Sequence, residues 1–325
     1  MKKTLLFIAI IAIFVGCSED TSRRVDLAGS VFGTTYKITY LDTDINYQKE
    51  LDSLFEMTNN SVSTYIPNSI ISKVNRGENV PIDTIFSEVL QKSKRIYKET
   101  NGFFDPTVGS LVNAYGFGPA NSKINLTQKQ IDSIMPFVGL DKVRAEGAII
   151  QKEHPNIYLD FNSIAKGSGI DIVARFFDAK GINNYLIEIG GEIRTKGVKG
   201  EGKPWVIQVV NPVDADNSGG FKKINLSNKS MATSGNYRKF RVSDNGTKYV
   251  HTINPKTGKA EESNLLSASI IGTSDCADVD AYATAIMAMG LEKAKEFLDK
   301  RSDLEVILIY TDEKNQLQEY TNLKN

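Results

Sequence analysis

The sequence is poor in cysteine and histidine and carries no excess of either charge. Of its 325 residues, only Cys17 and Cys276 are cysteines, so no internal disulfide can form if Cys17 is modified. The 39 basic and 39 acidic side chains cancel, which argues against a nucleic-acid surface or a strongly basic membrane patch. No Pro/Ser-rich linker, low-complexity tract or repeat divides the chain. We therefore expect one large domain that is stabilised by its own hydrophobic core.

The N-terminus has the pattern of an export signal. Two lysines precede an apolar run from Leu5 to Val15, which is too short to span a membrane. A glycine before Cys17 and a polar stretch after it resemble a bacterial lipoprotein processing site, although Phe14 stands where such sites usually carry Leu. The alternative is an ordinary secreted protein that is cleaved nearby. The expected divisions are a signal peptide at 1–16, a lipidated tether at 17–24 and the folded domain at 25–325.

Strand-like and helix-like hydrophobic patterns are mixed along the chain, which predicts an α+β fold with mixed and antiparallel sheets flanked by helices. Extended segments are expected at 25–30, 35–40, 61–65, 148–151, 157–160, 185–189, 192–196, 205–210, 223–226, 231–233, 240–242, 249–253, 265–271, 305–310 and near Gln318. Helices are expected at 47–57, 68–75, 83–102, 127–134, 160–181, 275–290 and 291–300, with Asn68, Asp83 and Thr127 as caps.

Acidic residues crowd the start of the expected helix at 275–290. Asp280 and Thr284 are four residues apart, so a helix places both on one face with Cβ atoms about 5–6 Å apart. Carboxylate and hydroxyl are hard oxygen ligands, and Mg²⁺ usually takes only one or two such groups from a protein. In the alternative interpretation, Asp275 or Asp278 caps the helix, Asp280 favours its dipole, and Thr284 is incidental.

A second candidate site is the segment from Gly102 to Gly109. Phe103 and Phe104 lie beside Asp105, which we expect as the N-cap of a helix whose first residue is Pro106. Adjacent aromatic rings at an open helix N-terminus are suited to stack on a flat ring and to face an anion. The alternative is core packing for the two rings and simple capping for the aspartate.

Glycines mark two further places where the backbone approaches something closely. Gly167 and Gly169 stand in the first turns of the expected helix at 160–181 and cost about 1 kcal/mol each against alanine. The pair Gly190-Gly191, flanked by Glu188 and Glu192, interrupts a strand pattern and indicates a bulge or a ligand on the backbone.

His251 is one of only two histidines, and it precedes a Pro-Lys-Thr-Gly turn. A histidine at a strand end is suited to be a general base or a phosphate contact. The alternative is a hydrogen-bonded structural histidine.

Eight motifs occur in a fixed order: Phe-Gly-Thr-Thr-Tyr (32–36), Ser-Thr-Tyr (63–65), Gly-Phe-Phe-Asp-Pro-Thr-Val-Gly (102–109), Asp-Phe-Asn-Ser-Ile-Ala-Lys-Gly (160–167), Glu-Ile-Gly-Gly-Glu (188–192), Ala-Thr-Ser-Gly-Asn-Tyr (232–237), His-Thr-Ile-Asn-Pro-Lys-Thr-Gly (251–258) and Asp-Ala-Tyr-Ala-Thr (280–284). Together they resemble the ApbE family, the FAD:protein FMN transferases. The resemblance covers essentially the whole mature chain. It implies a single ApbE-like domain related to the T-fold, and a periplasm-facing, Mg²⁺-dependent enzyme of the cell envelope. Such an enzyme transfers FMN from FAD to a threonine hydroxyl of a target protein and releases AMP. The implied acceptors are subunits of membrane redox complexes of the Nqr and Rnf type.

The resemblance also implies roles for single residues. The Mg²⁺ ligands would be Asp280, Thr284, the Ala283 carbonyl and Ser163. The FAD site would be lined by Phe32, Tyr65, Phe103, Phe104, Asp105, Asp160, Lys166 and Ile253. His251 is the catalytic candidate, with Asp280 as an alternative base. Phe32 replaces a usual methionine and Tyr115 a common tryptophan, which affects only ring contacts. Two rival functions remain at this point: an FAD pyrophosphatase that gives FMN and AMP, and a lipid-anchored flavin-binding protein without turnover.

Overall fold

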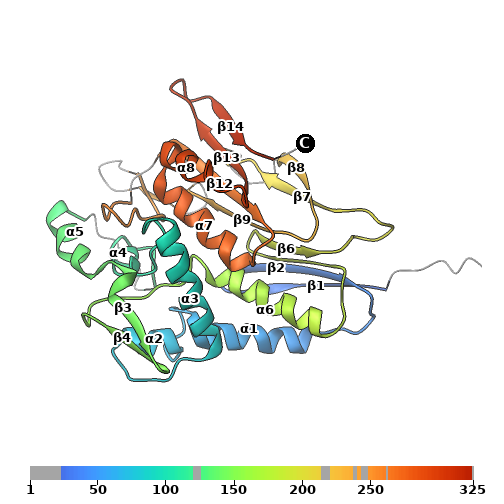
Figure 1. Ribbon diagram of the computed structural model, residues 1–325, viewed down its shortest axis with the longest axis horizontal. Helices are drawn as coiled ribbons and strands as arrows, with labels where there is room; N and C mark the ends of the chain where they lie inside the picture. Colours follow the sequence, from blue (N-terminus) through green and yellow to red (C-terminus); the bar gives the residue numbers. More distant parts are fainter. Residues whose placement is uncertain are drawn as a thin grey trace, which may run out of the picture.

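The computed structural model describes residues 23–119, 126–213, 220–236, 240–242, 248–260 and 263–323. They form one domain of helices and antiparallel sheet (Figure 1), which confirms the expected α+β fold class. The helices are α1 (Gln48–Val62), α2 (Ile70–Asn75), α3 (Thr84–Glu99), α4 (Gly109–Ala114), α5 (Gln128–Ile134), α6 (Ala165–Ala179), α7 (Cys276–Met289) and α8 (Leu291–Leu298). The strands are β1 (Arg24–Val31), β2 (Thr34–Leu41), β3 (Val143–Glu146), β4 (Ile149–Lys152), β5 (Tyr185–Ile189), β6 (Glu192–Lys196), β7 (Trp205–Val210), β8 (Gly220–Leu226), β9 (Ser230–Gly235), β10 (Phe240–Val242), β11 (Lys248–Val250), β12 (Leu265–Gly272), β13 (Glu305–Thr311) and β14 (Leu317–Thr321).

One large sheet organises the described residues. Its eight strands follow the order β1-β2-β5-β6-β9-β12-β13-β14, and each neighbouring pair is antiparallel. Two hairpins, β1-β2 and β5-β6, lie side by side because β2 pairs with β5. β6 then pairs with β9 and β9 with β12, so the sheet joins the two halves of the chain.

Helices α6 and α7 lie directly on one face of this sheet, and α1 and α3 pack against them (Figure 1). The sequence explains the amphipathic character of α3. The side chain of Asp83 accepts the Phe86 N–H as an N-cap, and Phe86, Val89 and Ile96 are fully buried along one face. Helix α7 differs because nearly all of its residues are buried. It is therefore a central helix, enclosed between the sheet and α3.

The opposite face of the sheet is covered by the hairpin of β7 and β8. Ile207 and Leu226 from this hairpin pack with Ile193, Ile271 and Ile309 from the large sheet in a second apolar cluster. The side chains of β7 alternate between buried and exposed positions, as expected for a strand with one solvated face. The sheet is thus covered by helices on one side and by a hairpin on the other.

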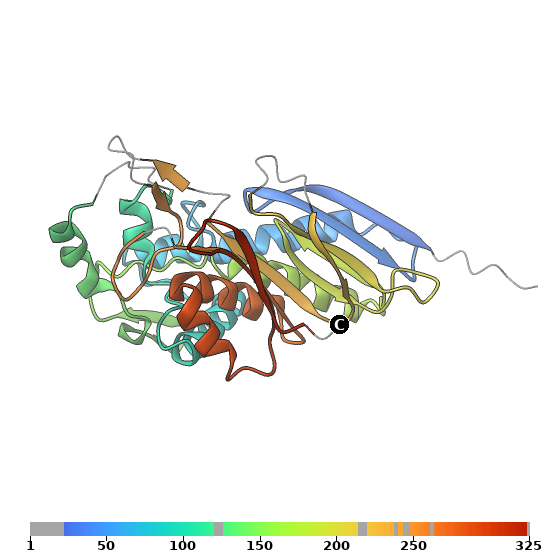
Figure 2. The same ribbon diagram turned by 90° about the horizontal axis from the view of Figure 1, so that it is seen from above.

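A third apolar cluster closes one end of the molecule. Leu111 and Tyr115 of α4 and Ile131 of α5 pack there with Ile253 and Ala260, which follow β11. Figure 2 shows β10 and β11 at the same end as α4 and α5. Residues from the middle and from the last third of the chain therefore build this end together.

Several boundaries differ from the sequence-based expectations. The segment 157–160 forms a single bridge from Tyr158 to Val108 rather than a strand, and β3 was not expected. Helix α1 extends to Val62, which lies in a segment expected to be extended. Ser69 rather than Asn68 caps α2. Because strand ends and short strands depend on their pairing partners, local pattern alone places them poorly.

The N-terminal prediction lies mostly outside the described residues. The signal peptide and Cys17 belong to residues 1–22, which the structure does not describe, and Arg24 at the end of the expected tether already belongs to β1. None of the helices in the described part of the chain combines the length and apolar character that a membrane span requires.

Candidate functional site

The N-terminal ends of α6 and α7 cross in close contact, and glycine makes this crossing possible. A Cβ atom on Gly167 would lie 2.5 Å from the Cys276 carbonyl oxygen and 2.6 Å from the Ala277 Cα atom. The glycines of this turn therefore serve close approach, as their cost in helix propensity indicated. The approaching groups at Gly167 are the backbone of α7, and at Gly169 the ring of Phe32, whose Cε2 atom would lie 2.5 Å from an added Cβ.

At the crossing, each helix is capped by an aspartate of the other. Asp280 of α7 accepts the Gly167 N–H through Oδ2 at 3.1 Å. Asp171 of α6 accepts the N–H groups of Cys276 and Ala277 at 2.8 and 2.9 Å. Neither helix has a side-chain cap bond from its own N-cap residue. Both aspartates are buried, so their oxygens satisfy amides that water does not reach.

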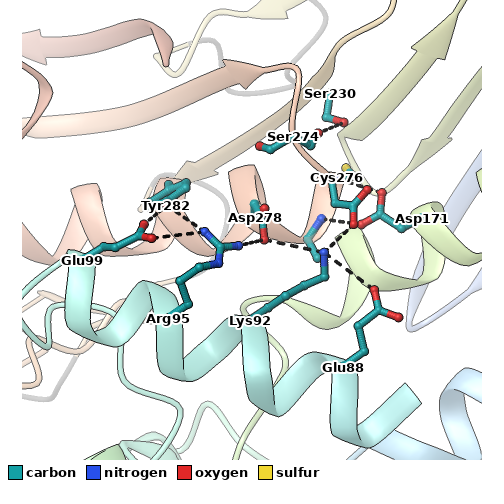
Figure 3. Close-up of polar contacts among 12 residues, drawn as sticks. Glu88, Lys92, Arg95, Glu99, Asp171, Ser230, Ser274, Cys276, Asp278 and Tyr282 are labelled. Carbon is teal, nitrogen blue, oxygen red and sulfur yellow. Dashed lines mark hydrogen bonds and ion pairs between the residues drawn. The ribbon is translucent and has the colours of Figure 1, made fainter. Parts of the chain in front are cut away.

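The expectation that Asp275 or Asp278 caps α7 is therefore wrong. Asp275 occupies the N-cap position, but its carboxylate pairs with Lys92 and with Arg194. Asp278 pairs with Arg95, at 2.6 Å (Figure 3). The sequence pattern cannot separate a cap from an ion pair, because both place an acid in the first turn.

These ion pairs form a network along α3 and the start of α7 (Figure 3). Arg194 also pairs with the fully buried Asp171, so one guanidinium joins the cap of α7 to Asp275. Burial raises the pKa of Asp275, but hydrogen bonds from Lys92 and Arg194 outweigh it and lower the pKa to about 2. Burial and the Asp275 charge raise the pKa of Asp171 to about 6, against the opposing effects of Arg194 and the capped amides. The network fixes the N-terminus of the helix that carries Asp280 and Thr284.

Lys166 lies at the same crossing between two buried carboxylates. Its Nζ atom is 3.3 Å from Oε1 of Glu192, the first residue of β6. Burial lowers the pKa of Lys166, but Asp280 and Glu192 raise it more, and the net shift is upward. Burial raises the pKa of both carboxyl groups, and Lys166 offsets only part of the rise. A positive charge beside buried carboxyl groups favours their ionised form, so a cation bound here would stabilise them as carboxylates.

The predicted metal ligands lie partly together. Asp280 and Thr284 share α7, and the Thr284 hydroxyl is 3.3 Å from that of Ser234 on β9. Ala283 is fully buried beside them, and Ser163 lies in the turn before α6, four residues from the amide that Asp280 caps. Asp280 makes its hydrogen bond to the Gly167 N–H through Oδ2.

This donor set of one carboxylate, two hydroxyls and a carbonyl fits Mg²⁺, which takes few protein groups. Within the described ranges no group of three or more His, Cys, Asp or Glu side chains gathers as a metal site, so a cluster rich in such ligands is not the arrangement found.

The aromatic segment divides into a core residue and an accessible one. Phe104 is 1% exposed and belongs to the main core, so its ring packs as the alternative interpretation stated. Phe103 is partly buried, and the ammonium groups of Lys256 and Lys293 lie 5.9 and 5.3 Å from its ring centre. Such cation contacts stabilise both partners and add positive charge beside the ring.

Asp105 does not cap a helix, which corrects that expectation. Its carboxylate accepts the N–H and the hydroxyl of Thr107 at 2.8 and 2.6 Å in a tight turn, and α4 begins only at Gly109. Burial raises its pKa to about 6, although both Thr107 bonds oppose the rise. Proline at the next position fits this turn equally well.

Tyr65 and Asp160 are predicted flavin-site residues from two different segments. The ring of Tyr65 is 51% exposed, and its hydroxyl donates to the Phe117 carbonyl at 3.4 Å. Burial and the Asp160 charge raise the Tyr65 pKa. Asp160 accepts the Asn162 N–H at 2.8 Å, which shapes the turn that leads to Ser163. Their contact with flavin stays a prediction.

Phe32 and Ile253 are held mainly by packing. Phe32 has a φ of +51° in the β1-β2 turn, and its ring packs edge-on against Phe55 at 5.7 Å. Ile253 is 5% exposed in the third apolar cluster. His251 follows β11 directly and is partly buried, which places it at the strand end as expected. Its catalytic role stays a prediction.

Sequence reasoning missed the roles of Asp171, Glu192 and Ser234. Asp171 had a signal, because it is an acidic residue within the apolar face Ile170 to Ala174 of an expected helix. The Gly190-Gly191 pair is a hairpin turn between β5 and β6, with φ of +64° and +101°, and not a bulge. This turn brings Glu192 to Lys166.

The chain matches known proteins along most of its length. The model of the ApbE family matches residues 32–308. A FAD:protein FMN transferase of Vibrio cholerae is 33% identical over 96% of this chain and 95% of its own, and one of Haemophilus influenzae is 34% identical over 96% and 94%. The solved flavin transferase ApbE from Vibrio cholerae superposes with a TM-score of 0.82 at 33% identity, covering 92% of this chain and 97% of its own. The ApbE protein of Thermotoga maritima gives 0.80 at 25% identity, over 91% and 96%. The chain therefore belongs to the ApbE family.

Proposed function

We propose that this protein is an FAD:protein FMN transferase that depends on Mg²⁺, attaches FMN to a threonine hydroxyl of a target protein and releases AMP. The observation that carries the proposal is the crossing of α6 and α7. It brings Asp280 to the N-terminus of α6 beside Lys166, and Thr284 follows on the same helix as Asp280. Relatives that cover nearly the whole chain and bear the name FAD:protein FMN transferase support the choice of substrate.

The reaction replaces the phosphoanhydride bond of FAD by a phosphoester bond to threonine. The oxygen of the acceptor threonine forms a bond to the phosphorus of the FMN half of FAD, and the bond from that phosphorus to the oxygen of AMP breaks. The threonine proton passes to a base, and AMP leaves with the bonding electrons. The chemistry that a bound Mg²⁺ supplies is neutralisation of the pyrophosphate charge and polarisation of the phosphorus.

The residues of the chain serve this reaction in distinct ways. Lys166 places an ammonium in the first turn of α6, where it can contact the pyrophosphate as a point charge. Asp280 and Thr284, with Ser163 and the Ala283 carbonyl, hold the metal. His251 is our candidate for the base that takes the threonine proton. Phe103 offers a partly buried ring for the flavin or the adenine.

The acceptor and the location follow from the proposed activity and from the N-terminus. We propose subunits of membrane redox complexes of the Nqr and Rnf type as acceptors. A lipid on Cys17 would hold the enzyme at the inner or the outer membrane, facing the periplasm. Metabolic labelling with palmitate, compared between wild type and Cys17→Ala, tests the anchor: wild-type chain without label would contradict it.

The activity is tested by intact mass spectrometry of a candidate acceptor domain incubated with the protein, FAD and Mg²⁺. A mass gain of one FMN, absent with EDTA and absent in an acceptor whose threonine is replaced by alanine, is the expected result. AMP release at the same rate with and without acceptor would instead indicate an FAD pyrophosphatase. Retention of FAD with no AMP release would indicate a flavin-binding protein without turnover.

A further inference from the structure

Glu192 is a buried acid of which only one carboxyl oxygen has a partner among the described residues. It is 3% exposed, its Oε1 atom contacts Lys166 at 3.3 Å, and its Oε2 atom has no hydrogen-bond partner among the described residues. A buried carboxylate oxygen without a partner costs free energy. The fold therefore gains little stability from this side chain. The contact with Lys166 is the feature that can explain its role.

Lys166 is held at a position that is unfavourable for a cation. Lys166 is the second residue of α6, at the positive end of the helix dipole, where a cation is disfavoured. A free lysine side chain would also lose rotamer entropy on being fixed. Without Glu192, this ammonium would be left with Asp280, which is also the predicted metal ligand.

The Gly190-Gly191 turn makes room for the lysine. Gly190 has a φ of +64°, and a Cβ atom there would lie 2.7 Å from Thr34 Cγ2 and 3.3 Å from Lys166 Cδ. Glu188 fixes the turn, because its Oε1 accepts the Gly191 N–H at 2.7 Å. The aliphatic part of the Lys166 side chain thus packs against Gly190, and its ammonium contacts the Glu192 carboxylate.

We propose that Glu192 is a positioning residue, which fixes the ammonium of Lys166 at the N-terminus of α6 so that its remaining donors meet the pyrophosphate of FAD. An ammonium has three N–H donors, so one bond to Glu192 leaves two for phosphate oxygens. The inference rests on the proposed function, which supplies a substrate with a pyrophosphate.

The test compares two probes that share parts of FAD. ADP carries the pyrophosphate, and riboflavin carries the flavin ring without phosphate. Both are titrated by calorimetry into wild type and Glu192→Gln, with EDTA present so that no metal contributes. For the variant we expect ADP affinity to fall about tenfold, the effect of losing one charge-assisted hydrogen bond, and riboflavin affinity to stay unchanged. Unchanged or tighter ADP binding overturns the inference, because removal of a negative charge alone would strengthen anion binding.

A double-mutant cycle shows whether Glu192 acts through Lys166. In a Lys166→Gln background, Glu192→Gln should change ADP affinity by less than about twofold, since the two side chains form one unit. A full tenfold loss in that background would show an independent role and would contradict the inference. Glu305→Gln is the matched control, because it removes the partner of Lys229 at 2.7 Å on the far part of the sheet and should leave ADP binding unchanged.

Unfolding temperatures of all variants show whether a change in ADP affinity comes from the position of Lys166 or from loss of the folded state. If Glu192→Gln does not fold, Glu192→Asp replaces it: this variant keeps the charge, shortens the reach and should still weaken ADP binding selectively. Wild type that transfers no FMN would overturn the proposed function and leave the ADP comparison to decide the role of Glu192. Wild type that binds no ADP without metal overturns the inference and leaves the proposed function to the transfer assay.

Discussion

Asp171 and Asp280 cap each other's helices: Asp171 on α6 accepts two amides of α7, and Asp280 on α7 accepts the Gly167 amide of α6. The two bonds to Asp171 and the one bond to Asp280 run in opposite directions across the same crossing. A change at either aspartate therefore affects the start of a helix other than its own.

Asp171→Asn should destabilise the fold strongly. The amide cannot pair with Arg194 as a carboxylate does, and one of the two capped N–H groups would face an NH₂ group. Breaking a buried ion pair costs about 3 kcal/mol or more, to be measured by urea unfolding. Asp178→Asn is the control on the same helix, because its pair with Lys196 is about one-third exposed or more on both sides, at 41% and 36%. Equal losses of unfolding free energy in the two variants would contradict a large contribution of Asp171 to the stability of the crossing.

Asp280→Asn should abolish Mg²⁺-dependent flavin transfer and leave the fold intact. The amide oxygen can still accept the Gly167 N–H, so the free energy of unfolding should change by less than about 1 kcal/mol. Asp280→Ala loses the cap as well and should be less stable than the asparagine variant. Transfer is measured from the mass of the acceptor, and wild-type activity in Asp280→Asn would overturn the assignment of this ligand.

Gly167→Ala should force α6 and α7 apart. The added Cβ would meet backbone atoms at 2.5 to 2.6 Å, and a backbone cannot turn aside as a side chain can. We expect a loss of about 3 kcal/mol in thermal or urea unfolding, at the upper end of overpacking effects. Gly272→Ala is the control, since its Cβ would have contacts of 3.5 Å and more. A mild effect at Gly167 would mean that the crossing adjusts easily.

Asp275 predicts a specific acid sensitivity. Its pKa of about 2 lies below the ordinary 3.8, so its contribution to stability is complete above about pH 4 and is lost as the pH falls through about 2. After a discount for the partial exposure of this carboxylate, the shift corresponds to about 1 kcal/mol. Urea unfolding at pH 5 and near pH 2 should therefore show a larger loss for wild type than for Asp275→Asn, by about that amount. Parallel losses in both proteins would contradict the role of the Lys92 and Arg194 bonds.

His251→Gln should slow FMN transfer without weakening FAD binding. Loss of a general base costs about 10²- to 10⁴-fold in rate. Single-turnover AMP release measures the rate, and flavin fluorescence measures the affinity. A parallel loss of affinity would assign His251 to substrate binding, and a wild-type rate would remove it from the mechanism.

The sequence predicted the helices and most strands of the sheet well, because α3 carries clear periodicity and an N-cap at Asp83, and α7 ends at Gly290 as expected. It also placed Asp280 and Thr284 on one helical face, as the structure shows. What it could not supply is which residues meet across the chain. Gly167 and Asp280 are 113 positions apart, and their contact depends on the packing of two helices on one sheet.

The same limit explains the errors at single residues. Asp105, Asp275 and Asp278 all stand where a cap is common, yet each finds a partner nearby that outweighs the cap. Phe104 is an aromatic residue of a functional motif, yet it fills the core. Local sequence fixes which groups a side chain offers, and tertiary packing decides which partner takes them.

The crossing of α6 and α7 also has a consequence for biosynthesis. Its two halves are made far apart in time, since a ribosome that has completed α6 must still add about a hundred residues before Asp280 exists, at roughly 5–20 residues per second. Until then the α6 N-terminus lacks its cap, Lys166 lacks one of its two carboxylates, and Asp171 has no helix to cap. A chain that stops before residue 276 therefore contains most of the family motifs but lacks the crossing, so we expect the proposed pyrophosphate site to form only after the last third of the protein has been made.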